Sequence, residues 1–150
     1  MPGKFFEDFV VDEEFLTPSR TLTETDVVMF AAMSGDYNEL HTSEAFMKNT
    51  QFGRRIGHGL LGLAVAHGLF FRLGLVEGTA IALLGIESWK FEAPYFLGDT
   101  IRVKIKVAEK KASQSKPDRG VIKFLFQVIK EDGTVAQSGY KSIMVRRKPS

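Results

Sequence analysis

The feature that most constrains the fold is a long apolar stretch in the middle of the chain, from Gly57 to Val76. Its length matches that of a membrane span, which needs about 20 predominantly apolar residues with few or no charges. The stretch contains two histidines, Arg72 and five glycines, however, and these residues argue against a span. We therefore expect a helix inside a globular domain that is apolar nearly all round. Glycine costs about 1 kcal/mol relative to alanine in a helix interior, so burial must hold this helix in place.

Beyond Gly78 the pattern changes to period two, with many β-branched and aromatic residues, which is typical of strands. Four long strands are predicted, at residues 79–93, 100–111, 120–130 and 135–146. Asp132-Gly133 indicates a two-residue hairpin between the last two strands. Within the second strand, Lys104 and Lys106 alternate with apolar residues, and we expect these lysines to lie on a solvated face of the sheet.

Shorter elements are predicted in the first half of the chain. Thr23 is expected to cap a helix that ends near Gly35, because acidic residues follow it in the first turn. Ser43 is expected to cap a second, shorter helix. The predicted elements here are a strand at 17–23, helices at 24–34 and 44–48, and a polar connection at 50–55. A long apolar helix combined with a mostly antiparallel sheet predicts a single α+β domain over residues 1–150.

Size, charge and cysteine content exclude several classes of protein. The 150 residues (16.8 kDa) suit one domain with one main core. The net charge is close to zero, with 20 Lys and Arg against 18 Asp and Glu, which argues against nucleic acid as a partner. We expect the basic run Arg146-Arg147-Lys148 to be a solvated tail. The absence of cysteine excludes disulfides, thiolate metal sites and cysteine nucleophiles. The N-terminal residues form no apolar signal region, so we expect a cytoplasmic protein without a membrane partner.

The first candidates for chemistry are Asp36 and His41, five residues apart after the first predicted helix. On a continuous helix the two side chains would point about 140° apart. They can converge only if the backbone leaves the helix between them, which Gly35 and Asn38 favour. An aspartate and a histidine aimed at one point could hold a water molecule and move its proton. The alternative is an ordinary turn in which these side chains bind the nearby backbone.

His58 is a second candidate, because it stands at the start of the long apolar helix. A helix N-terminus offers unpaired N–H groups that suit a developing oxyanion, and the adjacent Gly59 would let a ligand approach the backbone. The alternative is that the glycines serve packing and that His58 is a polar cap. His67 lies on the opposite side of the predicted helix from His58, so the two cannot bind one metal ion. Without an HExxH motif or a cysteine, we expect no metal site.

The sequence resembles the MaoC-like dehydratases, the family of (R)-specific enoyl-CoA hydratases also called hydratase 2. The resemblance rests on FAAMSGDYNELH at residues 30–41 and on FGRRIGHGLLG at residues 52–62. WKFEAP at residues 89–94, with Gly98-Asp99-Thr100, resembles the strand and turn that follow the central helix in that family. The likeness extends from about Phe5 to Val145.

The resemblance implies a hot dog fold, in which an antiparallel sheet wraps a long helix, and a homodimer or larger assembly with acyl-thioester tunnels at the subunit interface. It implies that Asp36 and His41 are the catalytic pair and that the backbone N–H of Gly59 polarises the thioester carbonyl. Asn38 matches the motif asparagine and is expected to hold the loop beside the substrate. The sequence departs from the family pattern at Glu39, which replaces the usual proline, and at Gly57, where alanine or valine is common.

The function implied is reversible hydration of a trans-2-enoyl-CoA to a (R)-3-hydroxyacyl-CoA, without a cofactor. We expect Asp36 to remove the water proton and His41 to deliver a proton to the α-carbon, although the reverse assignment stays open. A carrier-protein thioester is an alternative substrate, and a thioesterase or a non-catalytic acyl-thioester binding domain is an alternative function. His58, Arg54 and Arg55 are candidate substrate-binding residues, the arginines for CoA phosphates or a charged acyl group, unless they only face water. Residues that could line a tunnel or fill the core are Leu60, Leu63, Phe70, Phe71 and Leu84.

Overall fold

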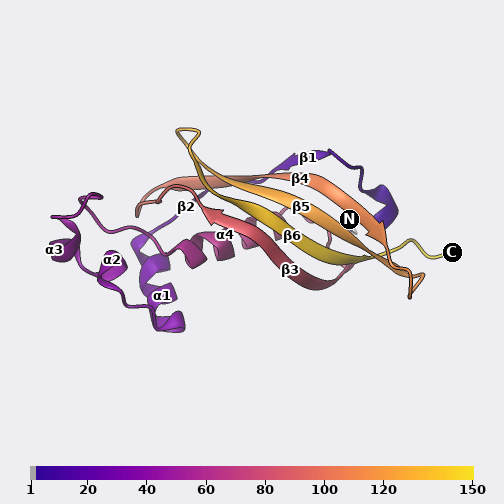
Figure 1. Ribbon diagram of the computed structural model, residues 1–150, viewed down its shortest axis with the longest axis horizontal. Helices are drawn as coiled ribbons and strands as arrows, with labels where there is room; N and C mark the ends of the chain where they lie inside the picture. The colour runs from indigo at the N-terminus through magenta and orange to yellow at the C-terminus, as the bar shows by residue number, and fades with distance from the viewer. Residues whose placement is uncertain (1–2) are drawn as a thin grey trace.

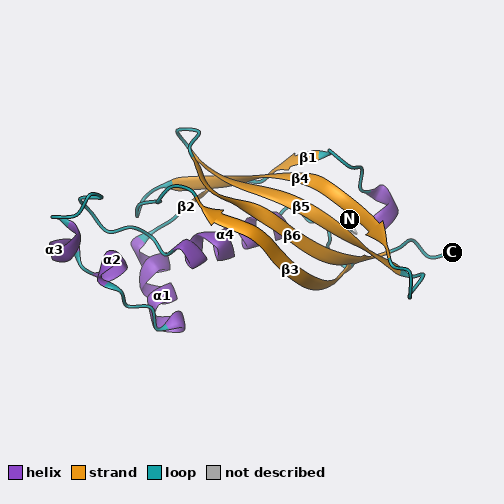
Figure 2. Cartoon of the chain, viewed as in Figure 1, coloured by secondary structure: helices purple, strands orange, loops and turns teal. Residues whose placement is uncertain are grey.

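The computed structural model describes residues 3–150 and consists of one antiparallel sheet curved around one long helix (Figure 1). The helix is α4 (Gly59–Phe71). The four long strands are β3 (Ala80–Phe91), β4 (Thr100–Ala112), β5 (Arg119–Lys130) and β6 (Val135–Arg146). They lie in the order β4-β5-β6-β3, and every pairing among them is antiparallel (Figure 2). The predicted α+β arrangement is confirmed.

The apolar helix is shorter than the sequence predicted. His58 is its N-cap, and after Phe71 the chain makes turns rather than continuing the helix. Gly74 and Gly78 both have positive φ, 68° and 72°, which a right-handed helix cannot contain. One face of α4 packs on the inner side of the sheet and forms the centre of the core. Its buried residues are Leu61, Gly62, Val65, Ala66, Leu69 and Phe70.

The predicted strand at 17–23 is wrong as a continuous element. Two short strands replace it, β1 (Glu14–Leu16) and β2 (Arg20–Thr21), and both pair with β4. Pro18 lies in the break and has no N–H to donate to a ladder. The hydroxyl of Thr17 accepts a hydrogen bond from the Val103 N–H at 2.8 Å instead. A 3₁₀ turn, η1 (Phe6–Asp8), precedes both strands.

Three helices lie beyond one end of the sheet, and both chain termini lie at the other end (Figure 1). The first is α1 (Glu24–Ser34), with the predicted cap: the Thr23 hydroxyl accepts from the Asp26 N–H. The second, α2 (Glu39–Thr42), was not predicted, because four residues leave no periodic pattern to detect. The third, α3 (Glu44–Met47), has the predicted Ser43 cap.

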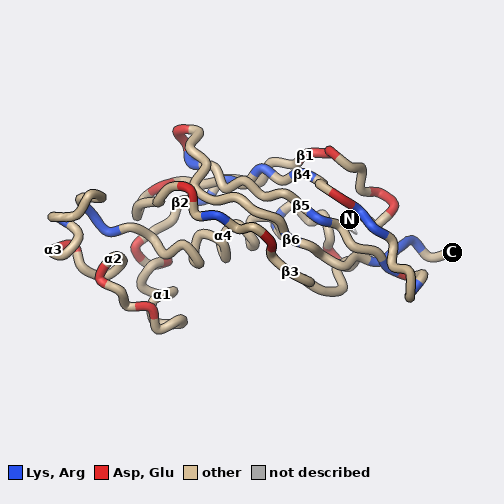
Figure 3. Tube along the Cα trace, viewed as in Figure 1, with Lys and Arg blue, Asp and Glu red and all other residues tan. Residues whose placement is uncertain are grey.

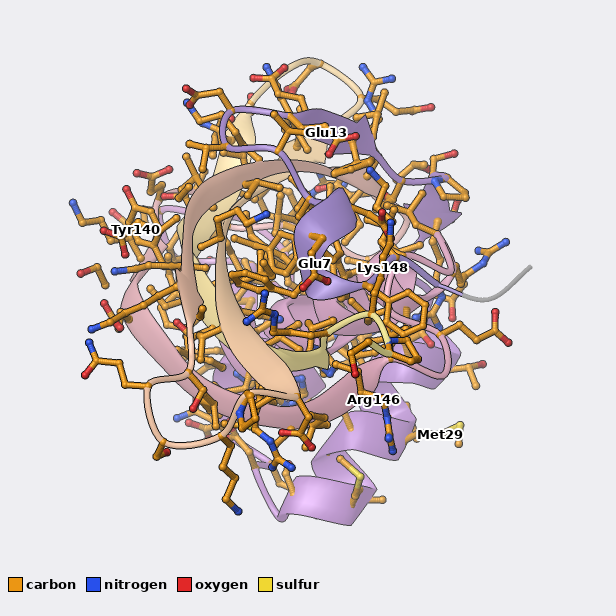
Figure 4. The ribbon with its side chains drawn as sticks, turned by 90° about the vertical axis from the view of Figure 1, so that its right-hand side faces the viewer. Glu7, Glu13, Met29, Tyr140, Arg146 and Lys148 are labelled. Atoms are coloured by element: carbon orange, nitrogen blue, oxygen red, sulfur yellow. The ribbon has the colours of Figure 1, made fainter. Side chains whose placement is uncertain are left out.

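Lys and Arg alternate with Asp and Glu at many points along the chain trace (Figure 3). Lys104 and Lys106 lie on the solvated face as predicted and pair with Glu14 and Asp12, at 3.0 and 3.5 Å. The C-terminal basic run is held against η1, because Arg147 pairs with Glu7 and Lys148 with Asp8 (Figure 4). Arg147 holds the pKa of the Glu7 carboxyl down to about 2. Among the described residues, no helix is both long and apolar enough to cross a membrane.

Strand β3 is the exposed edge of the sheet. Within residues 3–150 it pairs only with β6, and its residues are exposed except for the partly buried Trp89. Ile86 and Phe91 lie opposite Lys141 and Gln137 of β6, which are buried, so these two apolar side chains project from the face of the sheet that carries α4. They remain 41% and 56% exposed because α4 does not cover this edge.

Candidate active site

Asp36 and His41 converge because the backbone changes direction between them. Gly35 ends α1 in the left-handed conformation, with φ of 79°, and residues 35–38 are not helical. Asn38 then starts α2, and its side-chain oxygen accepts a hydrogen bond from the Leu40 N–H at 3.0 Å. His41 lies in α2, and its Nε2 is 3.8 Å from Oδ2 of Asp36. Asn38 therefore holds this loop through its side chain.

His41 is a buried, neutral imidazole. Its Nδ1 lies 2.8 Å from the carbonyl oxygen of Ile56, which can only accept, so Nδ1 carries the proton. Burial lowers the pKa of His41 below its ordinary value, and the neighbouring His58 acts in the same direction. The lone pair of Nε2 therefore faces the Asp36 carboxylate and can accept a hydrogen bond. Asp36 itself is half-exposed, which leaves room for a small molecule beside it.

His58 belongs to the same cluster. Its ring stacks on that of His41, with centroids 3.8 Å apart, and its Nε2 donates to the backbone oxygen of Asp36 at 3.0 Å. Phe30 packs against it at 4.8 Å between ring centroids. The residue is 1% exposed, and no group among residues 3–150 hydrogen-bonds its Nδ1. The sequence indicated His58 as a candidate substrate-binding residue at the helix start, but spacing gave no signal for its contact with His41.

The helix start at Gly59 is tightly fixed. The Tyr95 hydroxyl donates to the His58 carbonyl at 2.5 Å, and Gln137 Nε2 donates to the Gly59 carbonyl at 3.0 Å. A Cβ on Gly59 would lie 2.8 Å from the Phe91 ring, so a larger residue there would require that ring to move. The first N–H groups of an α-helix have no partner within the helix, so the Gly59 N–H can serve a ligand.

The two departures from the family pattern have structural explanations. A Cβ on Gly57 would lie 1.8 Å from the Tyr95 ring, so this tyrosine occupies the space that a larger side chain would need. Burial raises the pKa of Tyr95 well above its ordinary value, which keeps its hydroxyl protonated. Glu39 stands at the first position of α2, where both proline and an acidic residue are favourable.

The two arginines predicted to bind substrate are engaged with other side chains. Arg55 bridges α1 and α3, with Nη2 2.8 Å from Glu24 and Nε 2.5 Å from Glu44. Its role in the structure is therefore to fasten these helices beside the site. Arg54 is exposed and lies over the Phe96 ring, 4.0 Å from the centroid.

The cluster of Asp36, His41 and His58 brings one potential ligand atom from each residue within 4.8 Å of the others. Atoms this close can share one small ligand, which could be a metal ion or a water molecule.

The candidate tunnel residues divide into two groups. Phe70 is fully buried and fills the core. Leu60, Phe71 and Leu84 are exposed, and Leu63 is half-buried. The exposed residues therefore remain available to a ligand or to another protein chain.

Comparison with known proteins identifies the family. The sequence model described as "MaoC like domain" matches residues 8–123. The chain belongs to the MaoC-like domain family. It is 36% identical over 110 residues to the 3-hydroxybutyryl-CoA dehydratase of Methylorubrum extorquens, a match that covers 70% of this chain and 64% of that protein. It is 29% identical over 121 residues to the (R)-specific enoyl-CoA hydratase of Aeromonas caviae, with 81% and 84% covered. Protein MaoC of Klebsiella aerogenes is 38% identical over 107 residues, but the match spans 31% of that longer protein.

Solved structures of MaoC-like proteins share the fold. An Archaeoglobus structure described as a monoamine oxidase regulatory protein has a TM-score of 0.92 and 32% identity, covering 99% of this chain and 98% of that one. The unliganded R-hydratase of Pseudomonas aeruginosa has a TM-score of 0.79 and 28% identity, with 96% and 86% covered. A Mycobacterium tuberculosis protein described as having a double hotdog fold gives 0.88 at 20% identity, covering 99% of this chain and 46% of that one. The predicted hot dog fold is confirmed.

Proposed function

We propose that this chain catalyses the reversible hydration of a trans-2-enoyl-CoA to a (R)-3-hydroxyacyl-CoA. The convergence of Asp36 and His41 beside the N-terminus of α4 carries the proposal. Relatives named 3-hydroxybutyryl-CoA dehydratase and (R)-specific enoyl-CoA hydratase support the reaction class. The match to the 3-hydroxybutyryl-CoA dehydratase covers 64% of that protein's length. The proposed activity therefore rests mainly on the geometry of the site.

The proposed chemistry begins with a water molecule held by the pair. The Asp36 carboxylate and the Nε2 lone pair of His41 both accept hydrogen bonds, so together they engage both O–H groups of one water. Its oxygen lone pair is then directed at C3 of the enoyl group. As the C–O bond forms, the Asp36–His41 pair takes one proton from the water, at the carboxylate or at the bare Nε2, and the pair returns one proton to C2, so that one water is added in total. Acid–base assistance of this kind contributes about 10²–10⁴-fold in rate.

The Gly59 N–H would stabilise the negative charge that develops on the thioester oxygen as the enolate forms. This N–H lies at the positive end of α4, and the Tyr95 and Gln137 hydrogen bonds hold it in position. Loss of one such donor in comparable sites costs about 3–4 kcal/mol of transition-state stabilisation. His58 would contribute by fixing the His41 ring and the Asp36 backbone.

We also propose that the chain works as a homodimer joined along β3. An exposed edge strand presents unpaired N–H and C=O groups and needs a partner or a cover. The exposed apolar side chains of Ile86 and Phe91 project beside α4, so a second copy related by a two-fold axis would bury them.

Mixing the purified protein with crotonyl-CoA tests the reaction class. Loss of the enoyl-thioester absorbance without release of free thiol is expected for a hydratase. Release of thiol would instead identify a thioesterase. Saturable binding of acyl-CoA without turnover of any enoyl-CoA would identify a binding domain.

A further inference from the structure

Two histidines and one carboxylate of the candidate active site form a set of metal ligands. Asp36 follows α1, His41 lies in α2 and His58 is the N-cap of α4, so three elements supply the cluster. Each residue brings one potential ligand atom within 4.8 Å of the other two, and Nε2 of His41 is 3.8 Å from Oδ2 of Asp36. Two imidazoles with one carboxylate are a donor set that proteins use for Zn²⁺.

The side chains of Asp36 and His41 are each oriented by one hydrogen bond to the backbone, which leaves a second atom available. The Asn38 N–H donates to Oδ1 of Asp36 at 3.2 Å, and Oδ2 lies on the side of His41. The His41 Nδ1–H donates to the Ile56 carbonyl at 2.8 Å, so the lone pair of Nε2 is available. Histidines that bind metals usually donate their other N–H to a carbonyl or carboxylate, because this bond fixes the tautomer and the direction of the ring.

His58 shows the same arrangement and also carries a nitrogen without a partner. Its Nε2 lies 3.0 Å from the backbone oxygen of Asp36, which can only accept, so Nε2 carries the proton and Nδ1 has a lone pair. Among residues 3–150, no group hydrogen-bonds this Nδ1, although the side chain is 1% exposed. A buried polar atom without a partner is unfavourable, and a cation bound beside it would supply one.

The cluster must contract to hold a metal ion. Zn²⁺ binds nitrogen and oxygen at about 2.0–2.2 Å, so neighbouring ligands in a tetrahedral site lie about 3.4 Å apart. The stacked rings of His41 and His58, with planes 27° apart, must also open, because an ion lies in the plane of each imidazole that binds it. Asp36 is half-exposed and lies in the loop after Gly35, so its carboxylate is free to move toward the rings. Binding therefore calls for rotation of these three side chains.

The donor set favours a transition-metal ion over Mg²⁺ or Ca²⁺. Imidazole suits Zn²⁺, whereas Mg²⁺ and Ca²⁺ prefer oxygen ligands throughout. The Nε2 lone pair of His41 and the carboxylate of Asp36, which would bind the ion, are also the groups that hold the water in the proposed hydration. An ion at this site therefore takes both groups away from that water.

We propose that Asp36, His41 and His58 bind one Zn²⁺ ion per chain and that the bound ion inhibits the hydration of enoyl-CoA. The metal site rests on the geometry of the three side chains, and the inhibition rests on the proposed function. The sequence predicted no metal site because it has no HExxH motif and because His67 cannot join His58, and spacing gave no signal that His41 would lie beside it.

Calorimetric titration of the metal-free protein with Zn²⁺ tests the site. We expect one ion to bind per chain. Asp36→Asn, His41→Ala and His58→Ala should each weaken binding by at least about 100-fold, because losing a group that only orients a ligand already costs about 10–100-fold. His67→Ala is the matched control and should bind like the wild type, since it removes the third histidine of the chain, which lies beside Lys141.

Co²⁺ tests the donor set without any substitution. Circular dichroism shows whether each variant is folded, but a spectrum of the wild-type protein with Co²⁺ does not depend on the variants. We expect the strong visible absorption of Co²⁺ with four or five ligands. The weak spectrum of the hydrated, six-coordinate ion would overturn the proposal, as would the absence of saturable Zn²⁺ binding or wild-type affinity in all three ligand variants.

The hydration rate of crotonyl-CoA, measured at the same Zn²⁺ concentrations, tests the inhibition. The rate should fall in proportion to the fraction of sites occupied, and Mg²⁺ at equal concentration should leave it unchanged. An unchanged or faster rate at saturating Zn²⁺ refutes the inhibition and leaves the metal site standing. A protein that binds Zn²⁺ at this site but hydrates nothing in its absence refutes the hydratase function, and the inhibition with it.

Discussion

Replacing Lys141 with methionine should stabilise the folded protein at neutral pH and remove one component of its pH dependence. The pKa of Lys141 falls from 10.5 to about 8 on folding, because burial penalises the charged form. Below pH 8 the Lys141 ammonium is charged in both the folded and the unfolded protein. The folded protein then carries the whole desolvation cost of burying this charge. With about 1.4 kcal/mol for each tenfold change in proton affinity, that cost is about 3 kcal/mol. No solvent screening reduces it, since the side chain is completely buried.

The sign of the pH effect follows from proton linkage. Between pH 8 and 10.5 the unfolded chain retains a proton on Lys141 that the folded chain has lost, so stability rises with pH in this range. From pH 7 to pH 10 the wild-type protein should gain about 2.5 kcal/mol relative to Lys141→Met. Other groups titrate in both proteins, so the difference between them isolates this lysine.

Urea denaturation of the two proteins at pH 7 and pH 10 measures this difference. We expect Lys141→Met to be the more stable protein at pH 7 and the gap to narrow at pH 10, with similar m-values throughout. A variant that is less stable than the wild type at pH 7, or a gap that does not change with pH, would refute the reasoning.

Three further predictions concern packing, assembly and capping. Gly57→Ala should lower the free energy of unfolding by about 1–3 kcal/mol, because its Cβ would overlap the Tyr95 ring; unchanged urea stability would contradict this contact. Ile86→Glu should convert a dimer to a monomer in light scattering, because a charge would be buried at the β3 edge; a dimer that survives would place the interface elsewhere. Thr23→Ala should cost about 1 kcal/mol in thermal or urea unfolding through loss of the α1 cap, and no measurable loss would argue against the capping box.

Much of the fold could be predicted because local patterns and tertiary structure agree. Alternation placed the four long strands, and Thr23 and Gly35 marked the ends of α1. The end of the long helix was misjudged because apolar residues continue beyond Phe71 although Gly74 turns the backbone. The first strand was misjudged because Pro18 interrupts the ladder.

The candidate site could be predicted only in part. Asp36 and His41 lie close in sequence, so a turn between them was enough to predict that their side chains converge. The stacking of His58 on His41 depends on how α4 meets α2, which no local pattern encodes. Lys141 did leave a signal, because the alternation in β6 places it on the same face as Ile143, but its partner His67 comes from a different element.

The catalytic role of the Asp36–His41 pair is tested most directly by the hydration rate of crotonyl-CoA in three variants. Asp36→Asn and His41→Ala should each lower kcat/KM by about 10²–10⁴-fold. Asp118→Asn, which alters an exposed carboxylate paired with Arg119, should leave the rate unchanged. Wild-type rates in both Asp36→Asn and His41→Ala would contradict the account.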